Sequence, residues 1–337
     1  MSHPSWRRLA GALSLALACL IASAAGAIDR SQLAVVINTR DPLSVRIGEA
    51  YAERRRLSFQ NIIRVEFTPG ASVMSLAEFE AVKAAVDAQT RPNVQAYALT
   101  WAAPYRVDCM SITAAFALGF DRAYCAEGCK PTQAVPYFNS VTRAPRRDFG
   151  LRPAMALAAT TYEEAIALIE RGIAADATRP SGTAYLLSTS DTHRNVRHLL
   201  FPLAERVAAG RVHVAELKQD TLSGAQDVMF YLTGRAQVDA LATLRFLPGA
   251  VADHLTSAGG MLTDSPQMSA LRWLEAGATG SFGTVVEPCN LLQKFPHPAV
   301  LMDRYLRGET LIEAYWKSVQ MPGQGIFIGE PLAAPWR

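Results

Sequence analysis

The sequence of 337 residues lacks the short motifs that mark nucleotide-binding proteins and the commonest hydrolases. It contains no G-x-G-x-x-G and no G-x-x-x-x-G-K-[ST], so neither dinucleotide binding nor P-loop nucleotide binding is expected. It contains no G-x-S-x-G either, the turn that exposes the nucleophilic serine of α/β-hydrolases. The sequence therefore predicts no cofactor, and any catalysis would use another set of side chains.

A strong charge of one sign is also missing. Lys and Arg total 33 and Asp and Glu total 30, for a formal net charge of +3. The local cluster 54–56, three arginines, falls near the end of a predicted helix, where cations interact favourably with the helix dipole. A basic stripe with interleaved aromatic residues is the usual footprint of nucleic-acid binding, and none is present. Nucleic-acid binding is therefore not expected.

Long apolar runs are absent except at the N-terminus. Two arginines at 7–8 precede an apolar run over 9–24, which ends in the small residues of 25–27. These are the three parts of a secretory signal, and the run is shorter than the roughly 18 residues that a spanning helix needs. We predict a signal peptide over 1–27 that is cleaved near Ala27. The exported protein, periplasmic or extracellular, should then have no membrane span.

Cysteine is scarce, and its placement fits an exported chain. Loss of Cys19 with the signal leaves Cys109, Cys125, Cys129 and Cys289, an even number in a compartment that permits disulfides. The first three lie in one turn-rich segment, which favours a bridge among them over a bridge to Cys289. Cys289 and one other thiol would then be unpaired. No histidine accompanies the cysteines of the segment, so no metal site is predicted.

The remaining chain alternates between strand and helix patterns. Strands are expected at 33–38, 61–67, 94–101, 183–190, 212–217, 227–234, from 248, at 277–286 and at 325–332. Helices are expected at 41–56, 75–89, 162–175, 195–209, 268–276 and 301–319. This alternation predicts an α/β fold, a three-layer sandwich with a mainly parallel sheet. We expect a single domain over 28–337 with a cysteine-containing insertion at about 104–153.

The last predicted helix carries charges at a regular interval. Glu309, Glu313 and Lys317 are spaced at i, i+4 and i+8. This spacing is typical of a solvated helix face, with the apolar residues between them packed inward. We expect these three side chains to be exposed.

The segment 248–298 holds the residues best suited to a functional site. Two predicted strands of this segment are each followed by polar residues, and a right-handed crossover brings both strand ends to one edge of the sheet. Ligands bind at that edge in open α/β sheets. The chemically capable residues there are Asp253, His254, Thr256, Ser257, Glu287, Cys289 and His297.

These candidates suggest roles in a hydrolytic site. Cys289 or Thr256 is the candidate nucleophile, His254 the candidate base and Glu287 the residue that orients the base. Asp253 adjoins His254 and, in an extended strand, points to the opposite face, so it is a poor orienter of the imidazole. The structural alternatives stay open, because buried cysteines are often inert and a buried histidine needs a hydrogen-bond partner in any case.

Three further residues are candidates for ligand binding. Asn38 and Asp41 follow the first predicted strand, where a nucleotide-binding protein would carry its glycines. Thr233 ends the strand before the one that carries His254. Each could line a site at the edge of the sheet.

Several long motifs give the chain a family resemblance. They are VVINTRDPLSVRIGEAYAERR, PYRVDCMSITAAFALGF, YCAEGC, FLPGAVADHLTSAGG, GATGSFGTVVEPCN, KFPHP, EAYWKSV and GEPLAAPW. With them the chain resembles an uncharacterised family of exported proteins found in bacteria that carry the exosortase sorting system. The resemblance implies a role in the cell envelope or in exopolysaccharide biology.

A more distant resemblance is to the gingipain and caspase-like peptidases. It is carried by the order of strands, by a G-A-T-G-S-x-G strand after a helix and by G-E-P-L near the end. In those enzymes a His-Gly pair ends one strand and a Cys ends the next. Here these places correspond to Thr233-Gly234 and His254-Leu255-Thr256, so the dyad is missing.

Two functional hypotheses follow. In the first, the chain is a non-catalytic envelope protein that binds a peptide or glycan in the cleft at the sheet edge. In the second, it is a cysteine- or threonine-type hydrolase that uses His254 with Cys289 or Thr256. A free Cys289 close to His254 would favour the enzyme, and Cys289 in a disulfide would favour binding. The missing dyad favours binding, and the oligomeric state is left open.

Overall fold

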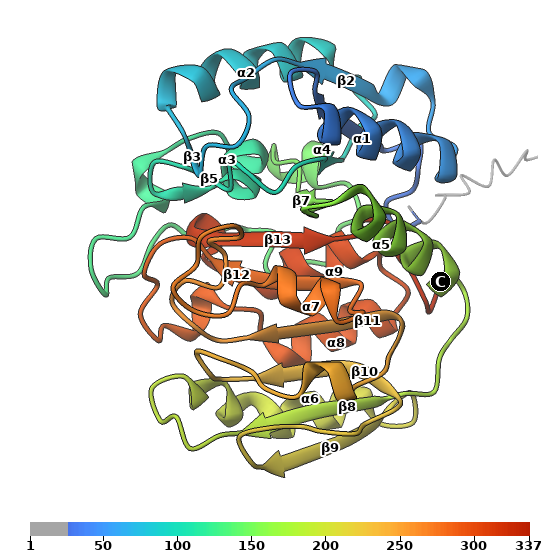
Figure 1. The fold of residues 1–337 in the computed structure, drawn as a ribbon, viewed down its shortest axis with the longest axis vertical. Helices are drawn as coiled ribbons and strands as arrows, with labels where there is room; N and C mark the ends of the chain where they lie inside the picture. The colour runs from blue at the N-terminus through green and yellow to red at the C-terminus, as the bar shows by residue number, and fades with distance from the viewer. Residues whose placement is uncertain (1–25) are drawn as a thin grey trace, which may run out of the picture.

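The protein is a three-layer α/β sandwich built on one large sheet (Figure 1). The computed structural model describes residues 26–337, so the predicted signal segment lies almost wholly outside the described residues. The sheet has ten strands in the order β2-β1-β4-β7-β13-β12-β11-β10-β8-β9. Its pairing is mostly parallel, with β12 and β13 antiparallel. The predicted fold class is confirmed.

The strands of the large sheet are β1 (Leu33–Asn38), β2 (Ile62–Val65), β4 (Ala96–Leu99), β7 (Ala154–Ala156), β8 (Thr183–Ser188), β9 (His213–Lys218), β10 (Val228–Thr233), β11 (Phe246–His254), β12 (Gly280–Thr284) and β13 (Gly325–Gly329). A small sheet contains β3 (Val73–Met74), β5 (Arg106–Val107) and β6 (Met110–Ser111). The α-helices are α1 (Pro42–Arg54), α2 (Leu76–Gln89), α3 (Ile112–Leu118), α4 (Pro145–Phe149), α5 (Tyr162–Ala175), α6 (Phe201–Ala208), α7 (Leu271–Glu275), α8 (Pro298–Leu306) and α9 (Leu311–Ser318). The 3-10 turns are η1 (Phe59–Asn61), η2 (Arg122–Tyr124), η3 (Asn195–Leu200), η4 (Leu241–Thr243), η5 (Leu292–Lys294) and η6 (Pro322–Gln324).

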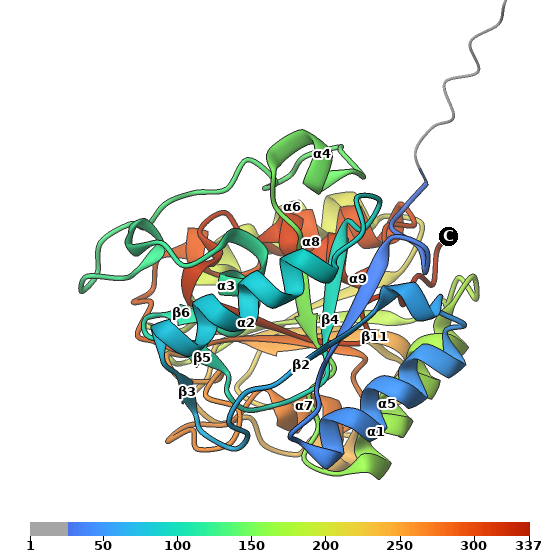
Figure 2. The ribbon, with the colours of Figure 1, turned by 90° about the horizontal axis from the view of Figure 1, so that it is seen from above.

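The helices cover both faces of the sheet. Figure 2 shows α1, α5 and α7 on one face and α2, α3, α6, α8 and α9 on the other. Strands covered on both sides are expected to be apolar throughout, and β1, β4 and β10 are buried at every position. Within residues 26–337, no helix combines the length and the apolar character needed to cross a membrane.

Local sequence signals explain where the first helices begin. The Asp41 side chain accepts a hydrogen bond from the Leu43 amide at 2.9 Å, and Pro42 occupies the first helical position of α1. Ser75 caps α2 in the same way, through the Glu78 amide at 3.2 Å. Both helices begin where the sequence predicts.

The segment 104–153 lies between β4 and β7. It supplies β5 and β6 of the small sheet together with α3 and α4. It leads into β7, a strand of three buried residues that the sequence analysis missed. A run of Ala-Met-Ala carries neither β-branched residues nor an alternating pattern, so nothing local distinguishes it from a loop.

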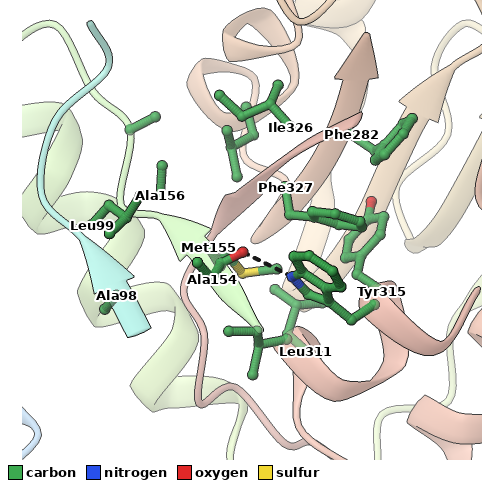
Figure 3. Close-up of a cluster of buried hydrophobic side chains, with 14 of the residues drawn as sticks. Ala98, Leu99, Ala154, Met155, Ala156, Phe282, Leu311, Tyr315, Ile326 and Phe327 are labelled. Carbon is green, nitrogen blue, oxygen red and sulfur yellow. Dashed lines mark hydrogen bonds between the residues drawn. The ribbon is translucent and has the colours of Figure 1, made fainter. Parts of the chain in front are cut away.

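Strand β13 lies in the middle of the sheet, between β7 and β12 (Figure 3). Its Phe327 ring stacks on Trp316 of α9, with the ring centroids 4.6 Å apart. The Trp316 indole N–H donates to the carbonyl oxygen of Ala154 at 2.8 Å. The C-terminal strand thereby joins the two halves of the sheet through one buried core.

Two expectations about the segment 301–319 are wrong. The predicted single helix is broken into α8 and α9 at Gly308, whose φ is +82°. The three regularly spaced charges are buried rather than solvated, since Glu309, Glu313 and Lys317 are at most 2% exposed. Lys317 donates to Glu309 at 2.7 Å, which pairs two of these charges inside the protein. Charge spacing alone does not distinguish a solvated face from a buried network.

Candidate functional site

The loops that follow β8, β11 and β12 line a cavity of about 440 Å³. We call this cavity the cleft. These strands belong to one parallel set with β10, so their carboxyl ends lie at the same edge of the sheet. The cleft is lined by Cys129, His193, Arg194, Leu255, Thr256, Ser257, Glu287, Cys289, Asn290 and Phe295. The cleft thus occupies the edge of the sheet that the sequence indicates.

The structure gathers four of the predicted residues in this cleft, Thr256, Ser257, Glu287 and Cys289. The residues Asp253 and His254, which immediately precede them, are 1% and 2% exposed and are not among the lining residues. The nucleophile candidates therefore line the cleft, whereas the expected base does not.

Both ring nitrogens of His254 are occupied by protein groups. Nδ1 accepts a hydrogen bond from the Trp273 indole N–H at 2.9 Å, and Nε2 lies 3.1 Å from the carbonyl oxygen of Met268. The indole can only donate, so Nδ1 is the acceptor and Nε2 carries the proton. Burial lowers the pKa of His254 to about 3. This neutral imidazole has no free lone pair, so the geometry does not support the expected role of general base.

Asp253 points away from His254, as predicted for neighbours in a strand. Its carboxylate pairs with the Arg197 guanidinium, and the same guanidinium donates to the Thr233 carbonyl oxygen at 2.9 Å. Burial raises the pKa of Asp253, although the Arg197 charge opposes this. The expected binding roles of Asp253 and Thr233 gain no support, because both side chains are 1–2% exposed behind the strand ends. Together these groups form a buried network.

Cys289 is not a free thiol. It is bonded to Cys129, and the second bridge joins Cys109 to Cys125. The expected bridge among the three clustered cysteines is confirmed, but the expectation that Cys289 stays unpaired is wrong. Its partner is distant by 160 positions in sequence, and only the fold brings their Cα atoms to 5.4 Å. A sulfur in a disulfide cannot attack as a thiolate.

Thr256 belongs to a hydrogen-bond network in the wall of the cleft. Its hydroxyl donates to Gln267 Oε1 at 2.6 Å and accepts from Arg194 Nε at 3.1 Å. Arg194 Nη1 in turn pairs with Asp191 at 2.9 Å. No basic group that could take the hydroxyl proton contacts Thr256 within residues 26–337, so the network fixes Thr256 and Arg194 in place without activating the hydroxyl.

Glu287 holds the loop after β12. Its Oε1 accepts a hydrogen bond from the Cys289 backbone N–H at 2.7 Å, and Cys289 has a φ of +54°, which non-glycine residues rarely adopt. Burial lowers the pKa of Lys294, while the nearby Glu287 charge raises it. Glu287 thus positions the disulfide, and it makes no contact with His254 that would orient the imidazole.

The other predicted binding residues lie elsewhere. The Asn38 side chain is 1% exposed and bonds the backbone of Phe67 in both directions, at 3.1 and 3.2 Å. Asp41 is the cap of α1 and lines a different cavity of about 370 Å³ near Thr100 and Thr160. Asn38 and Asp41 were predicted only as residues that could line a site after the first strand; neither lines the cleft, and Asp41 lines this other cavity.

Several polar side chains of the cleft are available to a ligand. Among residues 26–337, no hydrogen bond joins the side chains of Ser257 and Asn290 to another residue. Arg194 uses Nε and Nη1 for protein contacts, and Nη2 has no partner in the described part of the chain. These groups offer a hydroxyl, an amide and a guanidinium N–H to a polar ligand.

A second cavity of about 400 Å³ adjoins the cleft, and the two share Phe295. It is lined by Phe138, Asn139, Leu200, Leu203, Leu292, Gln293, Phe295, His297, Val300, Ser318 and Gln320. Leu203 is 43% exposed, and Leu199, next to the cavity in sequence, is 68% exposed. A cavity of mixed lining and a more strongly apolar one therefore lie side by side.

Several residues that line the cavities were not predicted from the sequence. His193 and Arg194 follow β8, a strand that pairs with β10 and so ends near the cleft. The position of polar residues after a predicted strand could have indicated them. The apolar wall has no such signal, because it is assembled from turns and helices far apart in the sequence.

Comparison with known proteins gives one informative match. No protein-family model and no curated protein matches the chain. A solved structure described as a protease matches 91% of this chain and 78% of its own, with a TM-score of 0.52 and 10% sequence identity. At this identity the match shows the fold alone. The chain therefore shares the overall fold of that structure, which agrees with the three-layer arrangement around a mainly parallel sheet.

Proposed function

We propose that the protein is an exported binding protein with a caspase-like fold, which holds an extended peptide in the cleft without cleaving it. One observation carries this proposal: the two groups that a cysteine hydrolase would need are already engaged. Cys289 is in a disulfide and both ring nitrogens of His254 are hydrogen-bonded. Catalysis needs a nucleophile and a base within reach of each other.

The chemistry of the two adjoining cavities favours a peptide. The guanidinium of Arg194 can bind a carboxylate or a peptide carbonyl, while Ser257 and Asn290 can bond to backbone groups. The neighbouring cavity, with Leu203 and Val300 in its wall, suits an apolar side chain. A peptide with an apolar residue next to a polar or C-terminal group meets both requirements.

The biological setting is proposed on the resemblance and on the expected export. The resemblance to exported proteins of exosortase-containing bacteria suggests a peptide of the cell envelope or of its sorting machinery. The two disulfides are compatible with an oxidising compartment outside the cytoplasm. An accessory role that presents or retains an envelope polypeptide is consistent with both.

The alternative function is a hydrolase, and one observation favours it: Cys289 and Thr256 line the same cleft. Reduction of the bridge to Cys129 would release a thiol at that wall. If the protein is a latent cysteine hydrolase, reduction should produce a Cys289 thiol that iodoacetamide alkylates rapidly at pH 6, together with peptide cleavage. Binding without cleavage in both redox states would contradict the hydrolase.

The binding proposal is tested with a peptide library under non-reducing conditions. Immobilised wild-type protein should enrich a subset of the peptides. The Ser257→Ala and Asn290→Ala proteins should bind these peptides on the order of tenfold more weakly, because each variant loses one or two hydrogen bonds to the peptide. Ser140→Ala, on a loop outside both cavities, is the matched control and should bind like wild type. Equal enrichment by all four proteins would overturn the assignment of the cleft.

A further inference from the structure

The backbone nitrogen of Ile28 lies 3.0 Å from Oε2 of Glu313. Both residues are completely buried. Glu313 occupies the first turn of α9, where it forms a capping box with Thr310. A carboxylate from near the end of the chain therefore meets the start of the described chain inside the protein.

The carboxylate of Glu313 is incompletely satisfied. Its Oε2 accepts from the Thr310 amide at 3.0 Å and the Thr310 hydroxyl at 2.6 Å, besides Ile28. Its Oε1 is buried and has no hydrogen-bond partner among residues 26–337. An unsatisfied oxygen on a buried carboxylate is costly.

The cations near Glu313 are engaged with another carboxylate. Lys317 donates to Glu309 at 2.7 Å, and Arg304 lies 3.7 Å from Glu309. Glu309 thus takes the direct contacts of both cations. Among residues 26–337, no salt bridge to Glu313 is formed, and the hydrogen bond that reaches it from outside its own helix turn comes from the nitrogen of Ile28.

Ile28 is the residue that follows the predicted signal cleavage site. The carbonyl oxygen of Ile28 accepts a hydrogen bond from Arg337 Nη2 at 3.1 Å, and the same nitrogen donates to the carbonyl oxygen of Ala27 at 2.6 Å. The bond to Ile28 does not require Ala27 to remain attached. Gly26 is exposed, so the described chain reaches the surface at this residue. Removal of the preceding residues would leave Ile28 seated in the protein.

We propose that the signal segment is removed between Ala27 and Ile28 and that the new α-ammonium of Ile28 forms a buried ion pair with Glu313. A signal peptidase would hydrolyse the peptide bond with water. The C–N bond breaks, the water oxygen becomes part of the new Ala27 carboxylate, and both water protons end on the Ile28 nitrogen, which becomes an ammonium. An amide offers Glu313 one N–H, whereas an ammonium offers three and a positive charge. The charge compensates the buried carboxylate, and the additional N–H groups can reach Oε1.

This ion pair makes processing a step that strengthens the fold. Glu313 fixes the start of α9, which packs against the central strand β13 through Trp316 and Phe327. Ile28 leads directly into β1 (Leu33–Asn38). The processed chain should be more stable than the same chain with residues still attached to Ile28. This inference does not depend on the proposed binding function.

The first test is the N-terminus of the exported protein. Intact-mass analysis and N-terminal sequencing of protein purified from the envelope or medium should give a chain that begins with Ile28. A chain that begins at any other residue would overturn the proposal.

The second test is a double-mutant cycle on two purified chains, one beginning at Ile28 and one at Gly26. In the chain that begins at Ile28, Glu313→Gln should raise the unfolding equilibrium constant on the order of a hundredfold, the cost of leaving a buried charge without its partner. In the chain that begins at Gly26 the same substitution should raise the unfolding equilibrium constant only on the order of tenfold. Equal effects in both chains would show that no ion pair forms.

A third measurement needs no core substitution, in case Glu313→Gln does not fold. The α-amine of the folded chain beginning at Ile28 should react with acetic anhydride on the order of a hundredfold more slowly than in urea. The Lys130 amine, whose side chain is 74% exposed, is the reference and should react similarly in both conditions. An α-amine that is equally reactive in the folded and unfolded chains would overturn the proposal.

Discussion

At the residue scale, the imidazole of His254 lies between an indole donor and a carbonyl acceptor. Trp273 and Met268 supply these groups, and burial keeps the ring neutral. A general base in a hydrolase needs a free lone pair directed at the nucleophile. His254 instead connects the end of β11 to the segment around α7.

The low pKa of His254 predicts a specific pH dependence of stability. The unfolded chain binds a proton near pH 6.5, whereas the folded chain binds it only near pH 3, so stability is complete above 6.5 and is lost as the pH falls towards 3. Relative to His254→Gln, wild type should lose up to about 1.4 kcal/mol per pH unit in this window. Urea unfolding of both proteins between pH 4 and 7.5 measures the difference. A difference that does not change with pH would contradict a neutral buried His254.

The sequence predicted the neighbourhood of the site better than the contacts of its residues. Thr256, Ser257 and Glu287 could be placed at one sheet edge because the strand pattern and crossover rule determine where strand ends lie. The hydrogen bond from the Trp273 indole to His254 could not be predicted, since it depends on the packing of two side chains that lie 19 positions apart in the sequence. The same limit applies to the bond from Cys289 to Cys129.

At the element scale, the break between α8 and α9 determines where the buried charges lie. Gly308 has a φ of +82° and places Glu309 and Glu313 in the protein interior. The i, i+4, i+8 spacing was correct for a continuous helix, but it carries no information about which neighbours cover that face. Gly308, visible in the sequence, was the available signal for a helix end.

Gly308→Ala should destabilise the protein more than a simple conformational penalty explains. Positive φ alone costs an alanine about 1–2 kcal/mol. A Cβ at Gly308 would also lie 2.8 Å from the Trp336 carbonyl oxygen, so the total should exceed about 2 kcal/mol. Gly70→Ala is the matched control, because its φ is +81° and a Cβ there meets nothing within 4 Å. Chemical denaturation measures the free energy of unfolding of both variants. Equal losses in the two variants would contradict the close contact between Gly308 and the Trp336 carbonyl oxygen.

At the scale of the whole molecule, two disulfides of very different span hold the 104–153 segment. Cys109–Cys125 spans 16 positions, and Cys129–Cys289 ties the segment to the loop after β12 across 160 positions. The second bridge also forms part of the cleft wall. The Cys129–Cys289 disulfide therefore contributes both to the stability of the folded protein and to the shape of the cleft.

Removal of the long-range bridge should cost more stability than removal of the short-range one. Chain entropy gives a stabilisation of about 5 kcal/mol for the longer loop and about 3 kcal/mol for the shorter, as upper values. The pair Cys129→Ser with Cys289→Ser should therefore lower the unfolding free energy about 2 kcal/mol further than Cys109→Ser with Cys125→Ser. Denaturation under non-reducing conditions compares them, and a larger loss for the short bridge would contradict this ranking.

The overall architecture could be predicted from the sequence, but the position of its last strand could not. The strand expected within 325–332 is confirmed as β13, which ends at Gly329, since alternating strands and helices define the fold class. The central place of β13 between β7 and β12 depends on Trp316 and Phe327 packing against a strand of only three residues. Such long-range packing has no local sequence signature.

The most direct test of the account is to incubate the oxidised protein, beginning at Ile28, with a peptide library and to analyse bound and free peptides by mass spectrometry. The account predicts that a subset of peptides is retained intact, and that retention falls in the Ser257→Ala and Asn290→Ala proteins. Peptides cleaved by the oxidised protein would contradict it, because Cys289 has no free thiol and His254 has no free lone pair in that state.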